Sequence, residues 1–296
     1  MIEFTPNEEG GYVDQWCVPP TVYLDHWAWR KISESELLTN RFSNALKACG
    51  GTLAVSWLNL VEFSRVTDER QTHKADTLLN AILPRAFILD PDFIKVCGKE
   101  DKILAGGERV APHADIVTLR NPVVLKFFLN NRPKPNAVKL SPPENLFSLV
   151  TASETTTLID GFEGSFIRQA ESLREDYDNN REFRLRVNRL PKGHPNQYGT
   201  RVIASELLGS FLKNKKVKAS GNHAVDYTHA VVAVAYCDYV LLDGHWATQV
   251  EQARKRIADG GLSFPMAKVF SEKGDGLKRF LQELESGGGK AAATKI

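Results

Sequence analysis

The chain has 296 residues, of which 42% are hydrophobic and 25% are charged, and its formal net charge is +2 at pH 7. These values are typical of a folded globular protein and exclude a chain that is disordered throughout. No apolar run approaches the roughly 20 residues of a membrane-spanning helix, and the first eleven residues are too polar for a signal peptide, so we expect a cytoplasmic protein with no membrane partner.

Strand-like and helix-like patterns alternate at the two ends of the chain. In chain order they are a strand at 21–24, a helix at about 33–49, a strand at 52–57, a helix at about 59–68, a short strand at 86–89, a helix at about 223–236, a strand at 239–242, a helix at about 246–259 and a strand at 267–271. This alternation predicts an α/β fold in which a parallel sheet carries helices on both faces.

The middle of the chain has a different pattern. Helical segments at 121–129, 157–177 and 201–213 are separated by links that contain Pro and Gly. We therefore predict an α/β core made of residues 1–90 and 220–275, with a large, mainly helical insertion at 91–219. Residues 284–296 include a run of glycines and are predicted to form a flexible tail.

Four acidic residues stand where these elements begin or end. Asp25 and Asp243 directly follow apolar strands, Glu62 comes soon after another strand, and Asp226 opens an apolar helix. In an open parallel sheet, ligands bind outside the carboxyl ends of the strands, so we expect the four side chains to converge at one edge. Crowded carboxylates repel one another unless a cation compensates them, and oxygen ligands favour Mg²⁺ or Mn²⁺ over zinc.

Each acid also has a structural interpretation. Asp25 suits a helix N-cap, and an acid such as Asp226 is favourable in the first turn of a helix. Asn59 and Glu62 have nearly the spacing of a capping box. Asp238 serves as a control, because it precedes the strand that Asp243 ends and should lie at the opposite edge of the sheet.

Two polar residues near these acids also have structural interpretations. His229 lies alone on an apolar helix, which is typical of a core histidine, and no zinc motif with the H-E-x-x-H spacing is present. Ser56 is equally compatible with support for a metal cluster and with a buried hydroxyl that bonds to the backbone. Neither residue is included in the predicted site.

The order of these pieces resembles the PIN-like superfamily of metal-dependent nucleases over about residues 20–90 and 220–272. The matching pieces are Val22-Tyr23-Leu24-Asp25, the run from 55 to 63 with Glu62, the run from 226 to 230 with Asp226, and the run from 238 to 243 with Asp243. The resemblance implies a three-layer PIN-like fold in which Asp25, Glu62, Asp226 and Asp243 are both the catalytic residues and the ligands of Mg or Mn. It also implies that the substrate is RNA.

A basic segment lies between residues 181 and 218. Its ten basic residues and two acidic residues give it a net charge of +8. We interpret it as a candidate phosphate-binding surface, and the alternative is an ordinary solvated helix face. The candidate nucleic-acid-binding residues are Arg181, Arg184, Arg186, Arg189, Lys213, Lys215 and Lys216.

These observations lead to the hypothesis of a divalent-metal-dependent nuclease, an endoribonuclease whose partner is RNA. One alternative is a catalytically inactive PIN-like module that binds nucleic acid or protein, because Leu241 stands where the family often has Thr or Ser. A third interpretation is a metal phosphohydrolase with a small substrate, although the first strand lacks a D-x-D motif. A protein partner or a homo-oligomer stays open.

Overall fold

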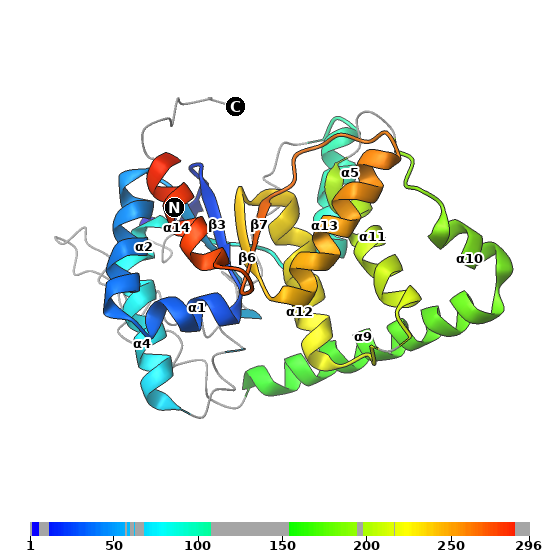
Figure 1. Cartoon of the computed structure of the whole chain (residues 1–296), viewed down its shortest axis with the longest axis horizontal. Coiled ribbons are helices and arrows are strands. Elements are labelled where there is room, and N and C mark those ends of the chain that lie inside the picture. The colour runs from blue at the N-terminus through cyan, green and yellow to red at the C-terminus, as the bar shows by residue number, and fades with distance from the viewer. Residues whose placement is uncertain are drawn as a thin grey trace.

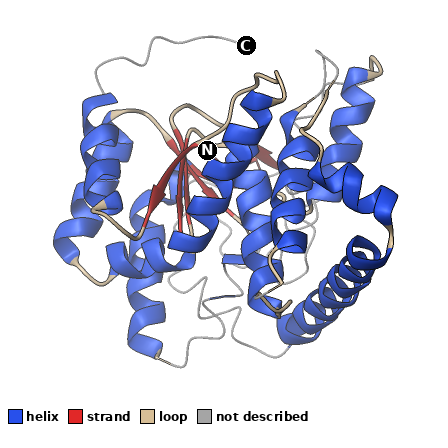
Figure 2. Ribbon diagram, turned by 45° about the vertical axis from the view of Figure 1, so that its right-hand side comes forward, coloured by secondary structure: helices blue, strands red, loops and turns tan. Residues whose placement is uncertain are grey.

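A computed structural model of the chain describes residues 2–5, 12–56, 58–59, 62, 68–107, 154–193, 198–215 and 217–287. Within these residues the protein has an α/β fold, in which a five-stranded, all-parallel sheet lies between two layers of helices (Figures 1 and 2). The predicted α/β class, with a parallel sheet between helices, is therefore confirmed, and its PIN-like type stays a prediction. No helix in the described part of the chain has the length and apolar character needed to cross a membrane.

The sheet has the spatial order β5-β4-β3-β6-β7. The strands are β3 (Thr21–Leu24), β4 (Thr52–Val55), β5 (Ala86–Ile88), β6 (Tyr239–Leu242) and β7 (Lys268–Ser271). The central strand β3 pairs with β4 and β6, and Val22 lies between Leu53 and Tyr239. Continuous apolar runs form these strands because both faces of a parallel sheet are covered by helices. All five predicted strands are confirmed, with ends within two residues.

One face of the sheet is covered by helices from the first and last parts of the chain. They are α1 (His26–Ser33), α2 (Glu36–Ala48), α4 (Glu69–Ile82) and α14 (Gly276–Gly287). The single 3₁₀ turn η1 (Leu83–Arg85) leads from α4 into β5. Val22 and Leu24 of β3 and Leu241 of β6 are buried among these helices, since alternate side chains of a strand point to opposite faces.

The other face is covered by α5 (Phe93–Leu104), α11 (Gly199–Lys213), α12 (Gly221–Tyr236) and α13 (Gly244–Asp259). Tyr23, Val240 and Leu242 pack on this side. The long helix α9 (Glu154–Asn179) crosses below α12 and leads to α10 (Arg181–Asn188) at the outer end of the molecule (Figure 1). The described part of the predicted insertion is mainly helical, and α11 packs into the same core as α12 and α13.

Three details differ from the sequence prediction. The helix predicted at 33–49 corresponds to α2, which begins at Glu36 because the side chain of Ser35 accepts a hydrogen bond from Leu38 N–H, and the preceding helix α1 was not predicted. The tail predicted at 284–296 is wrong for residues 284–287, because α14 continues to Gly287 and Leu284 is buried in one cluster with Phe280 and Leu281. An antiparallel pair, β1 (Ile2–Thr5) and β2 (Tyr12–Gln15), was not predicted.

Two predicted helices cannot be compared in full. The helix at 121–129 lies outside the described residues, and of the helix at 59–68 only residues 59, 62 and 68 are described. Residues 288–296 of the predicted tail also lie outside them.

Candidate metal centre

Asp25 lies at the carboxyl end of the central strand β3. Its backbone N–H donates to Leu241 O at 3.1 Å, which continues the pairing between β3 and β6. Its side-chain Oδ1 accepts from the backbone N–H of His26 at 2.8 Å and caps α1. The carboxyl is only 7% exposed. The predicted helix cap is therefore real, and one of the two carboxylate oxygens takes part in it.

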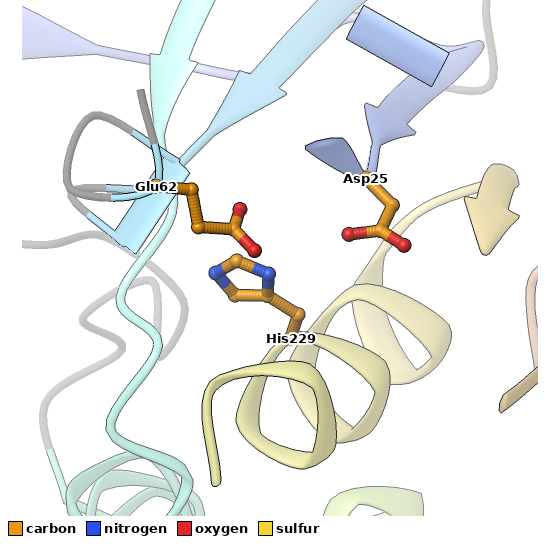
Figure 3. A group of neighbouring side chains, drawn as sticks. All are labelled: Asp25, Glu62 and His229. Atoms are coloured by element: carbon orange, nitrogen blue, oxygen red, sulfur yellow. The ribbon is translucent and has the colours of Figure 1, made fainter. Parts of the chain in front are cut away.

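Asp25 is one of three buried or half-buried side chains that come together from different elements. A carboxylate oxygen of Asp25, a carboxylate oxygen of Glu62 and a ring nitrogen of His229 all lie within 4.8 Å of one another. Figure 3 shows these side chains pointing toward one another, Asp25 from the end of its strand and His229 from α12. Two of the predicted site residues are thus neighbours, and a histidine completes the group.

The other two predicted acids lie close by. Asp226 precedes His229 by one turn of α12, so both face the same side of the helix. Asp243 follows β6 and caps α13, where its Oδ1 accepts from Trp246 N–H at 2.7 Å. Neither acid belongs to the group within 4.8 Å, but the negative charges of Asp25 and Asp243 both act on Asp226.

Burial and like charges raise the pKa values of two of these carboxyls. Burial raises the pKa of Asp25 to about 7, the hydrogen bond from His26 opposes the shift, and the charge of Asp243 adds to it. Burial also raises the pKa of Asp226 to about 8, with further increases from Asp25 and Asp243, while a hydrogen bond from Trp246 opposes the shift. Both carboxyls therefore tend to hold a proton near neutral pH when no cation is bound.

Asp238 shows what an aspartate does at the other edge of the sheet. Its Oδ2 accepts from the backbone N–H of Thr21 at 2.6 Å and from the Thr21 hydroxyl at 2.9 Å. These bonds tie the start of β3 to the start of β6. The prediction that Asp238 lies opposite the site is confirmed.

His229 is the residue that the sequence analysis left out of the site. It is 2% exposed, and burial lowers its pKa to about 3, so the ring is neutral at physiological pH. Its Nε2 lies 3.1 Å from Ser56 Oγ, while its Nδ1 has no hydrogen-bond partner among the described residues. The spacing of three residues from Asp226 was a usable signal, because it places both side chains on one helix face.

Ser56 and Asn59 support the ring of His229. Asn59 Oδ1 lies 3.3 Å from Ser56 Oγ and accepts from the Ser56 backbone N–H at 2.9 Å. Asn59 Nδ2 donates to Leu24 O at 3.3 Å and to the Tyr23 hydroxyl at 3.1 Å. Ser56 Oγ also accepts from the backbone N–H of Asn59 at 3.3 Å, so the hydroxyl both supports the ring and bonds to the backbone, as its two interpretations had it.

The described arginines of the basic segment on and after α10 lie away from the acidic cluster. Arg181, Arg184 and Arg186 are exposed on α10, and Arg189 is exposed directly after it. Figures 1 and 2 place α10 at the outer end of the molecule, away from the end of β3. The α10 arginines therefore do not border the acidic cluster.

The three predicted lysines of the basic segment differ in their surroundings. Lys213 ends α11, and burial lowers its pKa. Lys215 forms an ion pair with Asp178 at 2.7 Å. Lys216 lies outside the described residues.

Comparisons with known proteins add no family to this picture. No family model, curated protein or solved structure matches the chain. The PIN-like resemblance stays a prediction from the motifs quoted above, and the chemistry of the site has to be argued from its own residues.

Proposed function

We propose that this protein is a divalent-metal-dependent nuclease of the PIN-like type, an endoribonuclease that hydrolyses phosphodiester bonds with Mg²⁺ or Mn²⁺. The observation that carries the proposal is the convergence of Asp25 and Glu62 with the ring of His229, beside Asp226 and Asp243. The charges that act on Asp25 and Asp226 all come from other acids. Such a cluster gains stability from a cation.

The dimensions of the cluster fit one ion. Oxygen and nitrogen ligands lie about 2.1 Å from a small divalent cation, so ligands on opposite sides are about 4.2 Å apart. Three atoms that lie within 4.8 Å of one another are at most about 2.8 Å from a common centre, so each needs to move inward by less than about 1 Å to bind such an ion. Asp25 and Glu62 would hold the ion directly, and Asp226 and Asp243 would add negative charge beside it.

The chemistry of such a site suits phosphodiester hydrolysis. A bound Mg²⁺ or Mn²⁺ acts as a Lewis acid and neutralises charge on phosphoryl oxygens. The protein's part is to hold the carboxylates on rigid supports, namely the end of β3, the second turn of α12 and the N-cap of α13. It also buries Asp25 and so strengthens electrostatic interactions at the site. RNA as the substrate is supported by the family resemblance.

The direct test is cleavage of single-stranded RNA by the purified chain with Mg²⁺ or Mn²⁺. The same reaction with a chelator added is the negative control. Asp25→Asn and Asp226→Asn should each reduce cleavage on the order of 10²-fold or more, because both weaken the metal site. Asn keeps the side-chain oxygen that caps α1, so the fold should persist.

Asp238→Asn is the matched control, since it removes the same charge at the opposite edge of the sheet. It should cleave RNA as the parent does. Equal activity in Asp25→Asn and the parent, or cleavage that survives the chelator, would contradict the proposed function. Metal-free binding of RNA without any cleavage would favour the inactive binding module instead.

The basic segment provides a second test, because the α10 arginines would contact the phosphate backbone at a distance from the acids. Changing Arg181, Arg184, Arg186 and Arg189 together to Ala should weaken RNA binding. For single strands, each lost phosphate contact should reduce the slope of log affinity against log salt by about 0.7. The matched control changes four exposed lysines on other helices, Lys47, Lys74, Lys102 and Lys255. The same salt slope in both variants would show that α10 does not contact RNA.

A further inference from the structure

We propose that His229 is a direct ligand of the bound ion through Nδ1, and that the site therefore selects a first-row transition-metal ion such as Mn²⁺ over Mg²⁺. The inference rests on the metal site of the proposed function, but it does not depend on nuclease activity. It adds a nitrogen ligand to a set that the sequence had defined by carboxylates alone.

The first argument is the environment of Nδ1. His229 is 2% exposed, and its Nδ1 is buried with no hydrogen-bond partner in the described part of the chain. Buried polar atoms are normally hydrogen-bonded, and an ion that the site can hold is one explanation for an exception. Figure 3 shows that the ring nitrogen beside the attachment carbon, Nδ1, lies on the side of the ring that faces the carboxylates of Asp25 and Glu62.

The second argument is the position of the ring proton. The amide of Asn59 has a fixed orientation, because its Oδ1 accepts from the Ser56 backbone N–H and its Nδ2 donates to Leu24 O. Asn59 Oδ1 can therefore accept the Ser56 hydroxyl proton across 3.3 Å. Ser56 Oγ is then free to accept from Nε2–H of His229 at 3.1 Å. This arrangement leaves a lone pair on Nδ1.

A lone pair on Nδ1 is what a metal ligand requires. In known sites a ligating histidine donates its other ring N–H to a supporting group, which fixes its tautomer and orientation. Here Ser56 is that supporting group, and Asn59 holds it in place. The Nδ1 lone pair and the carboxylate oxygens of Asp25 and Glu62 are all electron donors, so a cation among them satisfies all three.

The ligand set determines which cation is favoured. Mg²⁺ prefers oxygen ligands and water, whereas imidazole favours transition-metal ions. Two carboxylates and one imidazole form a mixed set, which suits Mn²⁺ because it accepts carboxylates readily and tolerates nitrogen better than Mg²⁺ does. Asp25 and Glu62 alone would not make this distinction.

The experiment uses Mn²⁺ as the probe with the full chain. Pulsed electron paramagnetic resonance on bound Mn²⁺ should detect coupling to a histidine nitrogen, and the signal should change when the protein is made with ¹⁵N-histidine. Competition with Mg²⁺ should show tighter binding of Mn²⁺. Bound Mn²⁺ without nitrogen coupling in the parent would overturn the inference without any variant.

Variants then assign the nitrogen. His229→Gln should lose the coupling and should lose about tenfold more affinity for Mn²⁺ than for Mg²⁺. His73→Gln, on the exposed face of α4, is the matched control and should keep both properties. Ser56→Ala keeps the ring but removes the acceptor for Nε2–H, and it should weaken Mn²⁺ binding by about 10- to 100-fold. Coupling that persists in His229→Gln would overturn the inference.

These outcomes separate the ligand assignment from the proposed activity. Nitrogen-coupled Mn²⁺ in a protein that cleaves no RNA would contradict the proposed function and support the role of His229. Metal-dependent cleavage with equal affinity for Mg²⁺ and Mn²⁺ and no nitrogen coupling would support the proposed function and contradict the role of His229 as a ligand.

Discussion

Asp25 and Asp90 are both buried aspartates that follow strands of the same sheet, but their charges are compensated in different ways. Asp90, which is 2% exposed, forms ion pairs with Lys95 Nζ at 2.9 Å and with Lys99 Nζ at 3.2 Å. Asp25, which is 7% exposed, has Asp243 and Glu272 as the charges that act on it. The charge of Asp90 is compensated by lysines of the same chain, whereas Asp25 requires a proton or a bound cation.

The difference follows from the helices that face each strand end. Lys95 and Lys99 are four residues apart on α5, so one face of that helix presents both ammonium groups to Asp90. The helices near Asp25 instead carry acids, Asp226 in the second turn of α12 and Asp243 as the N-cap of α13. Comparing a compensated acid with an uncompensated one thus separates structural carboxylates from candidate metal ligands.

The first expected effect is stabilisation by Mn²⁺. A ligand that binds only the folded state at 100 times its dissociation constant raises the free energy of unfolding by about 2.7 kcal/mol. Thermal melts should show this gain for the parent and for Asp90→Asn, and should show little gain for Asp25→Asn. Equal stabilisation of Asp25→Asn and the parent by Mn²⁺ would show that Asp25 does not help to bind the ion.

A smaller effect is expected in the metal-free protein. Asp90→Asn should lower the free energy of unfolding on the order of 2 kcal/mol, because it removes the partner of two lysines that are only partly exposed. Asp25→Asn should not lower it, because the substitution relieves repulsion among acids. Urea unfolding in a chelator measures both values. A larger loss in Asp25→Asn than in Asp90→Asn would reverse the assignment of the two acids.

The last expected effect is a dependence of the free energy of unfolding on pH. Burial raises the folded-state pKa of Asp226 to about 8, well above the value of about 3.9 for an unfolded chain. Between these values the folded state binds more protons than the unfolded state, so the free energy of unfolding falls as pH rises from about 4 to 8. Asp226→Asn should remove this contribution.

Urea unfolding in a chelator at pH 5 and at pH 9 measures the dependence. The parent should lose more stability between the two pH values than Asp226→Asn does. Parallel losses in the two proteins would show that Asp226 is ionised in the folded state throughout this range.

The sheet and part of the site could be predicted because their signals are local. Apolar runs that end in acids define β3 and β6, and strand direction alone separates Asp243 from Asp238. Helix α1 was missed because it has only 8 residues and follows β3 directly after its cap, Asp25, which leaves little room for a periodic pattern. The burial of Leu284 was missed because the glycines that follow it suggested a tail.

The sequence by itself determined the α/β class, the strand edges and the acids that meet at the end of β3. Only the tertiary structure decided which polar groups accompany those acids. Ser56 and His229 are 173 residues apart in the chain, so their contact leaves no local pattern. The same holds for the distance of the α10 arginines from the cluster (Figure 1). Local residue patterns specify strands and helix ends, whereas the partner of a buried side chain depends on how distant segments pack.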